Sequence, residues 1–183
     1  MKYDGDTVKA WAGDSQWRAW RADLARFKKQ GHSGWGSEGF WALTLYRMQR
    51  AIVLSKYGLP LLPLKIVLTL VNKIFTVVTL INLNKNAPIG PGLFIPHGGP
   101  IIVHPDASLG ADCAIHQVCT VGAGAKPGAP QIGDHVMLGC HSCVLGPVVV
   151  GSRAKVGAGA VVTSDIPAGA TAVGVPAKPL GKS

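Results

Sequence analysis

Histidine is the side chain best suited to proton transfer near neutral pH, and His97 stands in an irregular stretch of this 183-residue sequence. Residues 93–110 read LFIPHGGPIIVHPDASLG, so His97 follows a proline and precedes two glycines in an otherwise aliphatic run. A histidine at such an interruption predicts a general base. The alternative is a histidine that only satisfies a hydrogen bond at a corner of the chain.

A six-residue period in the second half of the sequence predicts the elements that position His97. Thirteen hexads can be counted, and a small or β-branched side chain follows four residues after most of the aliphatic positions. This spacing is expected when each hexad forms one short strand and a tight corner, and three such strands close a triangular coil. Cys113 and Cys119 occupy small interior positions of this pattern. The aliphatic positions are Leu83, Ile89, Ile95, Val103, Leu109, Ile115, Val121, Ile132, Leu138, Val144, Val150, Val156 and Val162.

The period is interrupted twice. The interval from Ile95 to Val103 is eight residues, so two extra residues bulge out around His97. The interval from Val121 to Ile132 is eleven residues, so five extra residues loop out within the sequence GAGAKPGAPQ. Insertions in a repeat fold usually mark its working face. Both interruptions are therefore candidate parts of a functional site.

Counting hexads also predicts which residues lie above His97. Ile115 falls three strands after Ile95, so Gln117 stacks on His97 at about 4.8 Å, the spacing of neighbouring strands. If the eleven-residue interval is one hexad plus a loop, Cys140 continues the same column. A polar neighbour above the bulge fits a histidine that takes part in chemistry.

The first 80 residues are predicted to be helical. An apolar stripe at spacings of three and four predicts a first helix behind a cap at Asp14 or Ser15; the stripe consists of Trp17, Trp20, Leu24 and Phe27. Ser37 can cap a second helix that extends to residue 57. A third helix over residues 64–81 is strongly apolar, but a polar stripe along one face argues against a membrane span. We expect this helix to pack against the rest of the protein. The alternative is a helix that lies in a membrane interface.

The charge of the sequence is unevenly distributed. The formal net charge is +9, and residues 1–80 hold twelve Lys and Arg against five Asp and Glu. The second half lacks the mixture of aromatic and basic residues that nucleic-acid platforms use, so we expect no nucleic-acid partner. No segment near the start resembles a signal peptide, which favours a cytoplasmic location. The basic, apolar helices would also suit contact with the inner membrane surface.

Three segments carry a resemblance to a known family: GLFIPHGGPIIV, IHQVCTVG and the ending AKVGAGAVVTSDIPAGATAVGVPAKPL. Together with the hexads, they resemble left-handed β-helix acyltransferases of the serine acetyltransferase type over roughly residues 80–180. The resemblance implies an α+β fold, with a helical region at 1–80 and a left-handed β-helix at 81–183, assembled as a trimer or a dimer of trimers. It implies acetyl-CoA as cosubstrate, no metal, and a His97 that deprotonates an acceptor hydroxyl, which attacks the thioester directly.

The resemblance also implies a set of binding residues. Small residues would let the pantetheine arm lie along the coil, and cations would meet the nucleotide phosphates. The implied residues for acetyl-CoA are Ala123, Gly124, Gly139, Cys140, Arg153, Lys155, Ala158 and Lys178. Those for binding the acceptor and orienting His97 are Asn82, His104, His116 and Gln117.

The sequence departs from the serine acetyltransferase pattern at positions that hold the amino-acid acceptor in that family. Asn82 and Pro96 replace two aspartates, and Gly128 with Ala129 replaces an arginine–histidine pair. The carboxylate and ammonium of L-serine would then lack partners, which costs several kcal/mol in a partly dry groove. We therefore predict a sugar hydroxyl as acceptor, as in the exopolysaccharide-associated subset of the family. The alternative is L-serine, acetylated to O-acetylserine for cysteine biosynthesis.

Two other functions are weaker alternatives. The β-helix scaffold also occurs in zinc carbonic anhydrases, and this chain offers His97, His104, His116, His135 and His141. His135 and His141 are six residues apart and so lie on successive faces, which does not match that ligand arrangement. A non-catalytic scaffold is the other alternative, because Asn82 could mark a lost catalytic pair.

Overall fold

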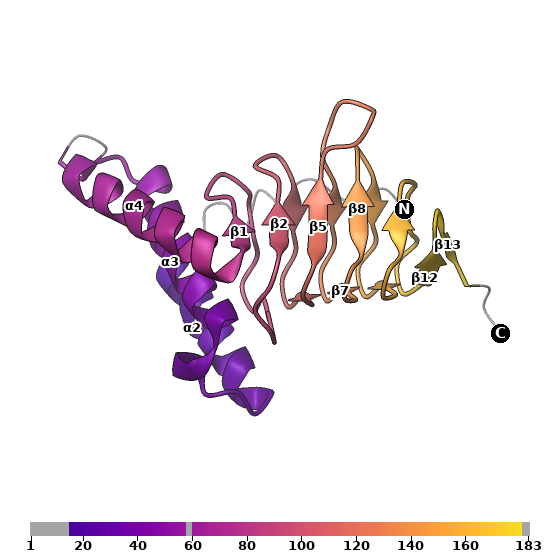
Figure 1. Ribbon diagram of the computed structural model, residues 1–183, viewed down its shortest axis with the longest axis horizontal. Helices are drawn as coiled ribbons and strands as arrows, with labels where there is room; N and C mark the ends of the chain where they lie inside the picture. Colours follow the sequence, from indigo (N-terminus) through magenta and orange to yellow (C-terminus); the bar gives the residue numbers. More distant parts are fainter. Residues whose placement is uncertain (1–14, 58–59, 181–183) are drawn as a thin grey trace.

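The computed structural model describes residues 15–57 and 60–180, which form a helical region followed by a coil of short strands (Figure 1). The helical region contains α2 (Gln16–Lys29), the short 3-10 helix η1 (Gly34–Gly36), α3 (Glu38–Leu54) and α4 (Leu62–Thr79). The predicted succession of helices and then strands is confirmed. Helix α3 ends three residues earlier than predicted, and α4 begins two residues earlier.

Within residues 81–180, the coil is built from thirteen strands, most of them two or three residues long. They are β1 (Ile81–Leu83), β2 (Ile101–Val103), β3 (Ser108–Leu109), β4 (Ala114–Ile115), β5 (Cys119–Gly122), β6 (Gln131–Ile132), β7 (Met137–Leu138), β8 (Cys143–Leu145), β9 (Val149–Val150), β10 (Lys155–Val156), β11 (Val161–Val162), β12 (Thr171–Gly174) and β13 (Ala177–Pro179).

These strands form three sheets, one on each side of a triangular coil. The first sheet has the order β1-β2-β5-β8-β11, the second β3-β6-β9, and the third β4-β7-β10-β12-β13. Every neighbouring pair is parallel except β12 and β13, which form an antiparallel end to the coil. The predicted left-handed β-helix is therefore confirmed.

The interior of the coil is filled by the hexad positions. The aliphatic residues from Ile132 to Val162 at intervals of six are all at most 1% exposed. The small positions between them are also buried. In the earlier hexads, the buried small positions include Cys113 and Cys119, as predicted. Aliphatic side chains fill such a narrow interior at the density that protein cores require. The repeat thus provides a rigid support for whatever projects at its corners.

A buried ion pair attaches the helices to the first turn of the coil. Arg47 of α3 donates two hydrogen bonds to the Asp23 carboxylate of α2, at 2.9 and 3.2 Å. The same guanidinium donates to the carbonyl oxygens of Ile89 and Gly90, both at 2.7 Å, and the Gly92 N–H donates to Asp23 at 2.8 Å. Burial raises the pKa of the Asp23 carboxyl, while Arg47 opposes that shift by stabilising the charged form.

Two further side chains of α3 bind the same edge of the coil. The Tyr46 hydroxyl donates to the Ala87 carbonyl oxygen at 2.6 Å and accepts the Ile89 N–H at 3.2 Å. Arg50 donates to the carbonyl oxygens of Lys85 and Asn86. Backbone groups at the edge of a sheet need partners when they are buried. Helix α3 therefore covers the open end of the coil and supplies those partners.

Helix α4 is far more exposed than expected, because the sequence analysis predicted that it packs against the rest of the protein. Within the described residues, Leu68 is the only side chain of α4 that is buried. Most of its aliphatic side chains are exposed, up to 76% for Val78. By length and composition, this 18-residue helix, with a mean hydropathy of 1.6, could cross a membrane. Figure 1 shows α4 projecting away from the coil at the outer end of the helical region.

Candidate functional site

His97 lies on the predicted bulge, at the corner between the third and the first sheet. Phe94 pairs with Ala114, and Ile101 of β2 pairs with Cys119 of β5. Five residues, 96–100, therefore connect the two sheets at this corner. The next turn of the coil uses only three residues there, 116–118. The prediction of two extra residues at this corner is confirmed. In Figure 1 the bulge projects from the lower edge of the coil, between β1 and β2.

The predicted register of Gln117 and Cys140 is confirmed, and the residue of the bulge that lies against Gln117 is Gly99, two residues after His97. Ile115 of β4 pairs with Leu138 of β7, so the eleven-residue interval does consist of one hexad and a loop. At the corner itself, the His141 N–H donates to the Gln117 carbonyl oxygen at 3.1 Å. In the following coil, the Gly159 N–H donates to the Cys140 carbonyl oxygen at 2.9 Å. The residues that share this corner are His97, His116, Gln117, Gly139, Cys140 and Ala158.

The bulge is held from the helical side. The Gly99 N–H donates to the carbonyl oxygen of Thr79, the last residue of α4, at 3.3 Å. Gly39, in the first turn of α3, lies so close to Ile95 that any side chain on Gly39 would overlap the Ile95 carbonyl oxygen. Two helices therefore fix the chain on both sides of His97.

The surroundings of His97 leave its imidazole accessible. The side chain is exposed, and it makes no hydrogen bond or ion pair with any other described residue. Next to the bulge, the side-chain oxygen Oε1 of Gln117 is buried without a hydrogen-bond partner among residues 15–57 and 60–180. A buried acceptor that lacks a donor is costly. The corner thus combines a free base with an unsatisfied acceptor.

Two predicted acceptor residues lie elsewhere on this chain. Asn82 is exposed on the outer face of the first sheet, where it pairs with Ile102. His104 lies at the opposite corner of that sheet, and its Nδ1 atom accepts the Asp106 N–H at 3.2 Å. Within one chain, neither residue is brought to the corner of His97. Their predicted roles remain predictions.

The residues predicted for acetyl-CoA are divided between corners. Ala123 and Gly124 belong to the exposed loop 123–130, which projects from the upper edge of the coil in Figure 1, opposite the bulge of His97. Lys155 and Lys178 lie on β10 and β13 of the third sheet, and both are exposed. Arg153 occupies the corner before β10, with a φ of 62°. One chain alone does not bring the whole set together.

Glu38 is a residue near His97 that the sequence analysis missed. It is the first residue of α3, and its carboxylate lies 3.2 Å from the position that a Cβ atom on Gly98 would occupy. Glu38 is far from His97 in the sequence and falls outside the hexads. Only the packing of Gly39 on Ile95 brings it to the bulge, and no local spacing in the sequence indicates that contact.

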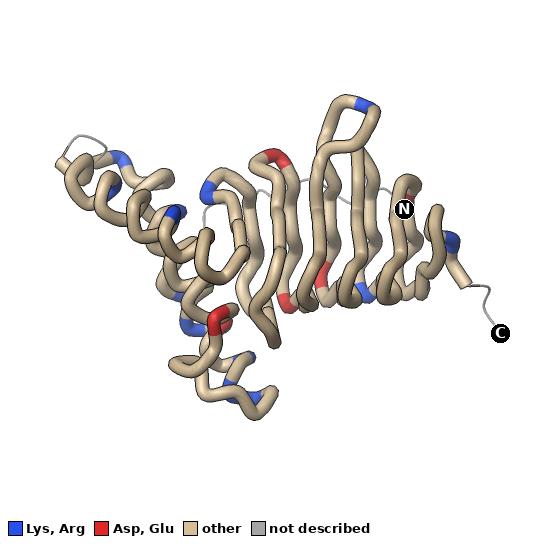
Figure 2. Tube along the Cα trace, in the orientation of Figure 1, with Lys and Arg blue, Asp and Glu red and all other residues tan. Residues whose placement is uncertain are grey.

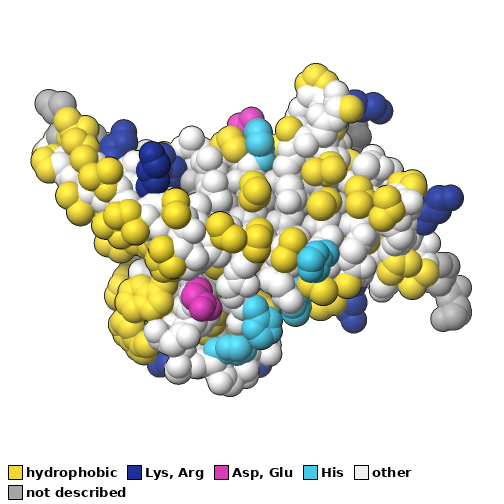
Figure 3. Space-filling model, in the orientation of Figure 1, with side chains coloured by type: hydrophobic (Ala, Val, Ile, Leu, Met, Phe, Trp, Pro, Cys, Tyr) yellow, Lys and Arg dark blue, Asp and Glu magenta, His cyan; other side chains and the backbone are white. Residues whose placement is uncertain are grey.

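The described residues offer little support for a metal site or for a catalytic thiol at Cys113 or Cys119. No group of three His, Cys, Asp or Glu side chains within 15–57 and 60–180 could hold a metal ion. Cys113 and Cys119 are buried, and burial raises the pKa of Cys113 to about 12. A protonated, buried thiol is a poor nucleophile. The histidines seen in Figure 3 are spread over several parts of the molecular surface.

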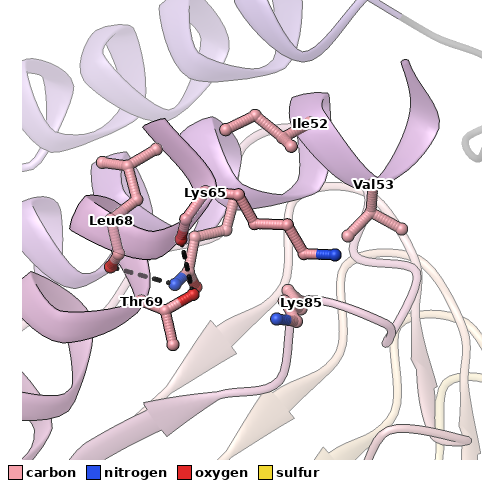
Figure 4. A pocket seen from close by; sticks show the side chains of 7 residues that line it. Ile52, Val53, Lys65, Leu68, Thr69 and Lys85 are labelled. Carbon is pink, nitrogen blue, oxygen red and sulfur yellow. Dashed lines mark hydrogen bonds between the residues drawn. The ribbon is translucent and has the colours of Figure 1, made fainter. Parts of the chain in front are cut away.

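A small pocket lies away from the bulge, between α3, α4 and the turn after β1. Figure 4 shows the Lys65 and Lys85 side chains converging on it. The lining residues are Gln49, Ile52, Val53, Lys65, Leu68, Thr69 and Lys85. None of them was predicted as a site residue, and the lining includes no His, Cys, Asp or Glu side chain. We therefore do not place the reaction there.

Comparison with known proteins places these features in context. The family model described as "Bacterial transferase hexapeptide (six repeats)" matches residues 129–164. A serine acetyltransferase of Helicobacter pylori is 33% identical over 147 residues, which cover 79% of this chain and 82% of that protein. The crystal structure of Neisseria gonorrhoeae serine acetyltransferase has a TM-score of 0.79 and 30% identity, and covers 96% of this chain and 69% of that one. A serine acetyltransferase in complex with CoA has a TM-score of 0.75 and 25% identity, with 96% and 72% covered.

These matches contradict the prediction of a sugar acceptor. The relatives and the similar structures are serine acetyltransferases, and none supports the exopolysaccharide-associated subset. The prediction assumed that partners for an amino acid must stand at Pro96, Gly128 and Ala129. Charged groups can also reach the bulge from a helix that is distant in the sequence, as Glu38 does. The absence of partners at those three positions was therefore not evidence for a sugar.

Proposed function

This chain belongs to the serine acetyltransferase family, and we propose that it transfers the acetyl group of acetyl-CoA to the hydroxyl of L-serine, which yields O-acetylserine for cysteine biosynthesis. The observation that carries the proposal is the identity of 33% over four fifths of both chains with a serine acetyltransferase. Consistent with it, the likeness to a solved serine acetyltransferase covers 96% of this chain.

His97 acts as the general base in this proposal. Its imidazole takes the proton from the serine hydroxyl, and the oxygen attacks the carbonyl carbon of the thioester directly. The bond from carbon to sulfur then breaks, CoA leaves with the electron pair, and the proton returns from the imidazolium to the thiolate. An exposed imidazole without an internal partner supports this role, because it can accept a proton without first losing another hydrogen bond.

The donor is held in a groove between two copies of the chain. Gly139, Cys140 and Ala158 share the corner of His97, whereas Ala123 and Gly124 lie at the opposite edge of the first sheet. In a ring with threefold symmetry, each subunit presents one edge to the other edge of its neighbour, so both sets can line one groove. We expect a trimer or a dimer of trimers in analytical ultracentrifugation. A monomer would contradict the shared groove.

We propose that the helical region binds the cytoplasmic face of a membrane with anionic lipids. Exposed aliphatic side chains cover most of α4, and Figure 2 shows Lys and Arg along the helical region. Lys65 and Lys85 converge beside the apolar helix, which suits lipid phosphates. The protein should co-sediment with anionic vesicles and less with neutral ones, and Val78→Glu should weaken this binding. A variant that binds as the wild type does would refute the contact.

The function is tested with the purified wild-type protein, acetyl-CoA and L-serine. CoA release is followed with a thiol reagent, and O-acetylserine is identified by mass spectrometry. L-alanine, which has the same carboxylate and ammonium but no hydroxyl, serves as the control acceptor. We expect CoA release with L-serine and none above background with L-alanine. A wild type that does not acetylate L-serine would overturn the proposal.

A further inference from the structure

Glu38 differs from every other carboxylate that the structure describes. Among residues 15–57 and 60–180, it alone of the Asp and Glu side chains makes no hydrogen bond or ion pair. The other five bind Arg47, Arg26, His104 or backbone N–H groups; they are Asp23, Asp112, Asp106, Asp134 and Asp165. Glu38 is also exposed, so its charge is available to a ligand.

The packing of α3 determines where this free carboxylate lies. Gly39 follows Glu38 and is pressed against Ile95, with no room for a side chain between the helix and the coil. Ile95 is itself fully buried and precedes the bulge by one residue. Glu38 is therefore attached to the part of the helix that is most closely fixed to the coil. Its position next to the bulge is a consequence of this contact.

The carboxylate lies over a backbone that carries no side chain. Its Oε2 atom is 3.2 Å from where a Cβ atom on Gly98 would be, and that residue directly follows His97. On the other side, the Gln117 side chain approaches Gly99, with its Cβ atom 3.3 Å from the corresponding position, and its Oε1 atom is buried and unpartnered. Two acceptors without donors thus flank the two glycines of the bulge. Figure 3 shows an acidic side chain beside histidines where the helices meet the coil.

An ammonium group is the ligand that this pair of acceptors suits. It carries three donors and no acceptor, so it can bind a carboxylate and an amide oxygen together. No ion pair joins Glu38 to His97, so the carboxylate is not occupied by the base itself. On the basis of the function proposed above, we propose that Glu38 binds the ammonium of the acceptor, with Gln117 as the second partner. Glu38 is thereby a specificity-determining residue for an amino-acid acceptor.

The test compares two acceptors that differ in the ammonium alone. Wild type and Glu38→Gln are assayed with L-serine and with 3-hydroxypropionate, which keeps the hydroxyl and the carboxylate but has no ammonium. For L-serine, Glu38→Gln should raise KM about 10- to 100-fold, the range expected for one charge-assisted hydrogen bond, and change kcat little. The KM for acetyl-CoA and the kinetics with 3-hydroxypropionate should stay the same as in the wild type. Glu38→Asp should restore part of the affinity for L-serine.

Asp165→Asn is the matched control, because Asp165 is also exposed but already accepts the Val149 N–H at 2.8 Å. It should leave both acceptors unaffected. If Glu38→Gln weakens both acceptors equally, or neither, the inference is wrong while the proposed function stands. If the wild type does not acetylate L-serine, the proposed function fails, and this inference fails with it. The assay of the wild type therefore separates the two outcomes.

Discussion

The coil and the helical region bury their polar backbone groups in different ways. In the coil, each strand forms hydrogen bonds with the equivalent strand of the next turn. Neighbouring turns therefore satisfy the backbone hydrogen bonds of one another. The first turn of the coil has no neighbouring turn on its outer side. There, the side chains of Arg47, Tyr46 and Arg50 take the place of a strand and bind its carbonyl oxygens.

The other end of the coil is closed by backbone instead of side chains. Strand β12 continues the third sheet, and β13 folds back on it in the antiparallel direction. The comparison teaches that a repeat supports itself in the middle and depends on unique residues where it stops or is interrupted. The bulge of His97 is one such interruption, and it is held by contacts from α3 and α4.

The largest expected effect comes from removing the base at the point where the two regions meet. His97→Ala should lower kcat by about 10²- to 10⁴-fold, the contribution of a general base, with little change in acetyl-CoA affinity. Because His97 is exposed and makes no hydrogen bond or ion pair with any other described residue, the melting temperature should stay the same. Steady-state kinetics and a titration with acetyl-CoA measure both effects. A variant with full activity would show that His97 is only a corner residue.

Breaking the buried ion pair should have the largest effect on stability. Arg47→Ala leaves the Asp23 carboxylate buried without its partner and frees two carbonyl oxygens of the first coil. Removing one member of a buried pair costs about 3–5 kcal/mol. The free energy of unfolding should fall by about that amount in a urea titration.

The double variant Asp23→Leu with Arg47→Met sharpens this result. It removes the uncompensated charge, so it should be more stable than Arg47→Ala. If the double variant is no better, then the contacts of Arg47 with the carbonyl oxygens of Ile89 and Gly90 carry most of the effect. Either result tells how the helices are attached to the coil.

Lys155, a cation of the coil, should affect ligand binding and not stability, in contrast to Arg47. Lys155 is exposed on β10 and makes no ion pair or hydrogen bond through its side chain within the described residues. Lys155→Ala should leave the free energy of unfolding unchanged. If this lysine binds a phosphate of the donor, the variant should weaken acetyl-CoA binding by about 1.5–3 kcal/mol in a calorimetric titration. An unchanged affinity would assign Lys155 to the solvated surface.

The coil and its interruptions could be predicted because their causes are local. A residue at a hexad position faces the interior whatever the rest of the chain does, since the strand and corner repeat every six residues. The same counting placed Gln117 and Cys140 at equivalent positions of successive turns, as the pairing of Ile115 with Leu138 confirms. This prediction needed only the numbers of residues between successive aliphatic positions of the hexads.

The contacts between the two regions could not be predicted in this way. Asp23 and Arg47 each look like surface residues of an amphipathic helix, and their pairing depends on how α2 and α3 lie against the first coil. The same holds for Glu38 at the bulge and for the exposed face of α4. Such arrangements result from packing between elements that are distant in the sequence, and local patterns contain no record of them.

The smallest expected effect concerns the thiols, which report how tightly the coil is closed. Burial raises the pKa of Cys113 to about 12 and also raises that of Cys119, so both thiols are less ionised at a given pH than an exposed cysteine is. In the native protein, iodoacetamide should modify Cys140 and Cys143, which are half-buried, and leave the other two unmodified until the chain unfolds. Mass spectrometry of peptides after labelling at pH 7 and pH 9 measures this. Labelling of Cys113 in the native state would mean that the coil next to the helices opens locally, so that the side-chain partners of its first turn hold it less firmly than the repeats hold one another.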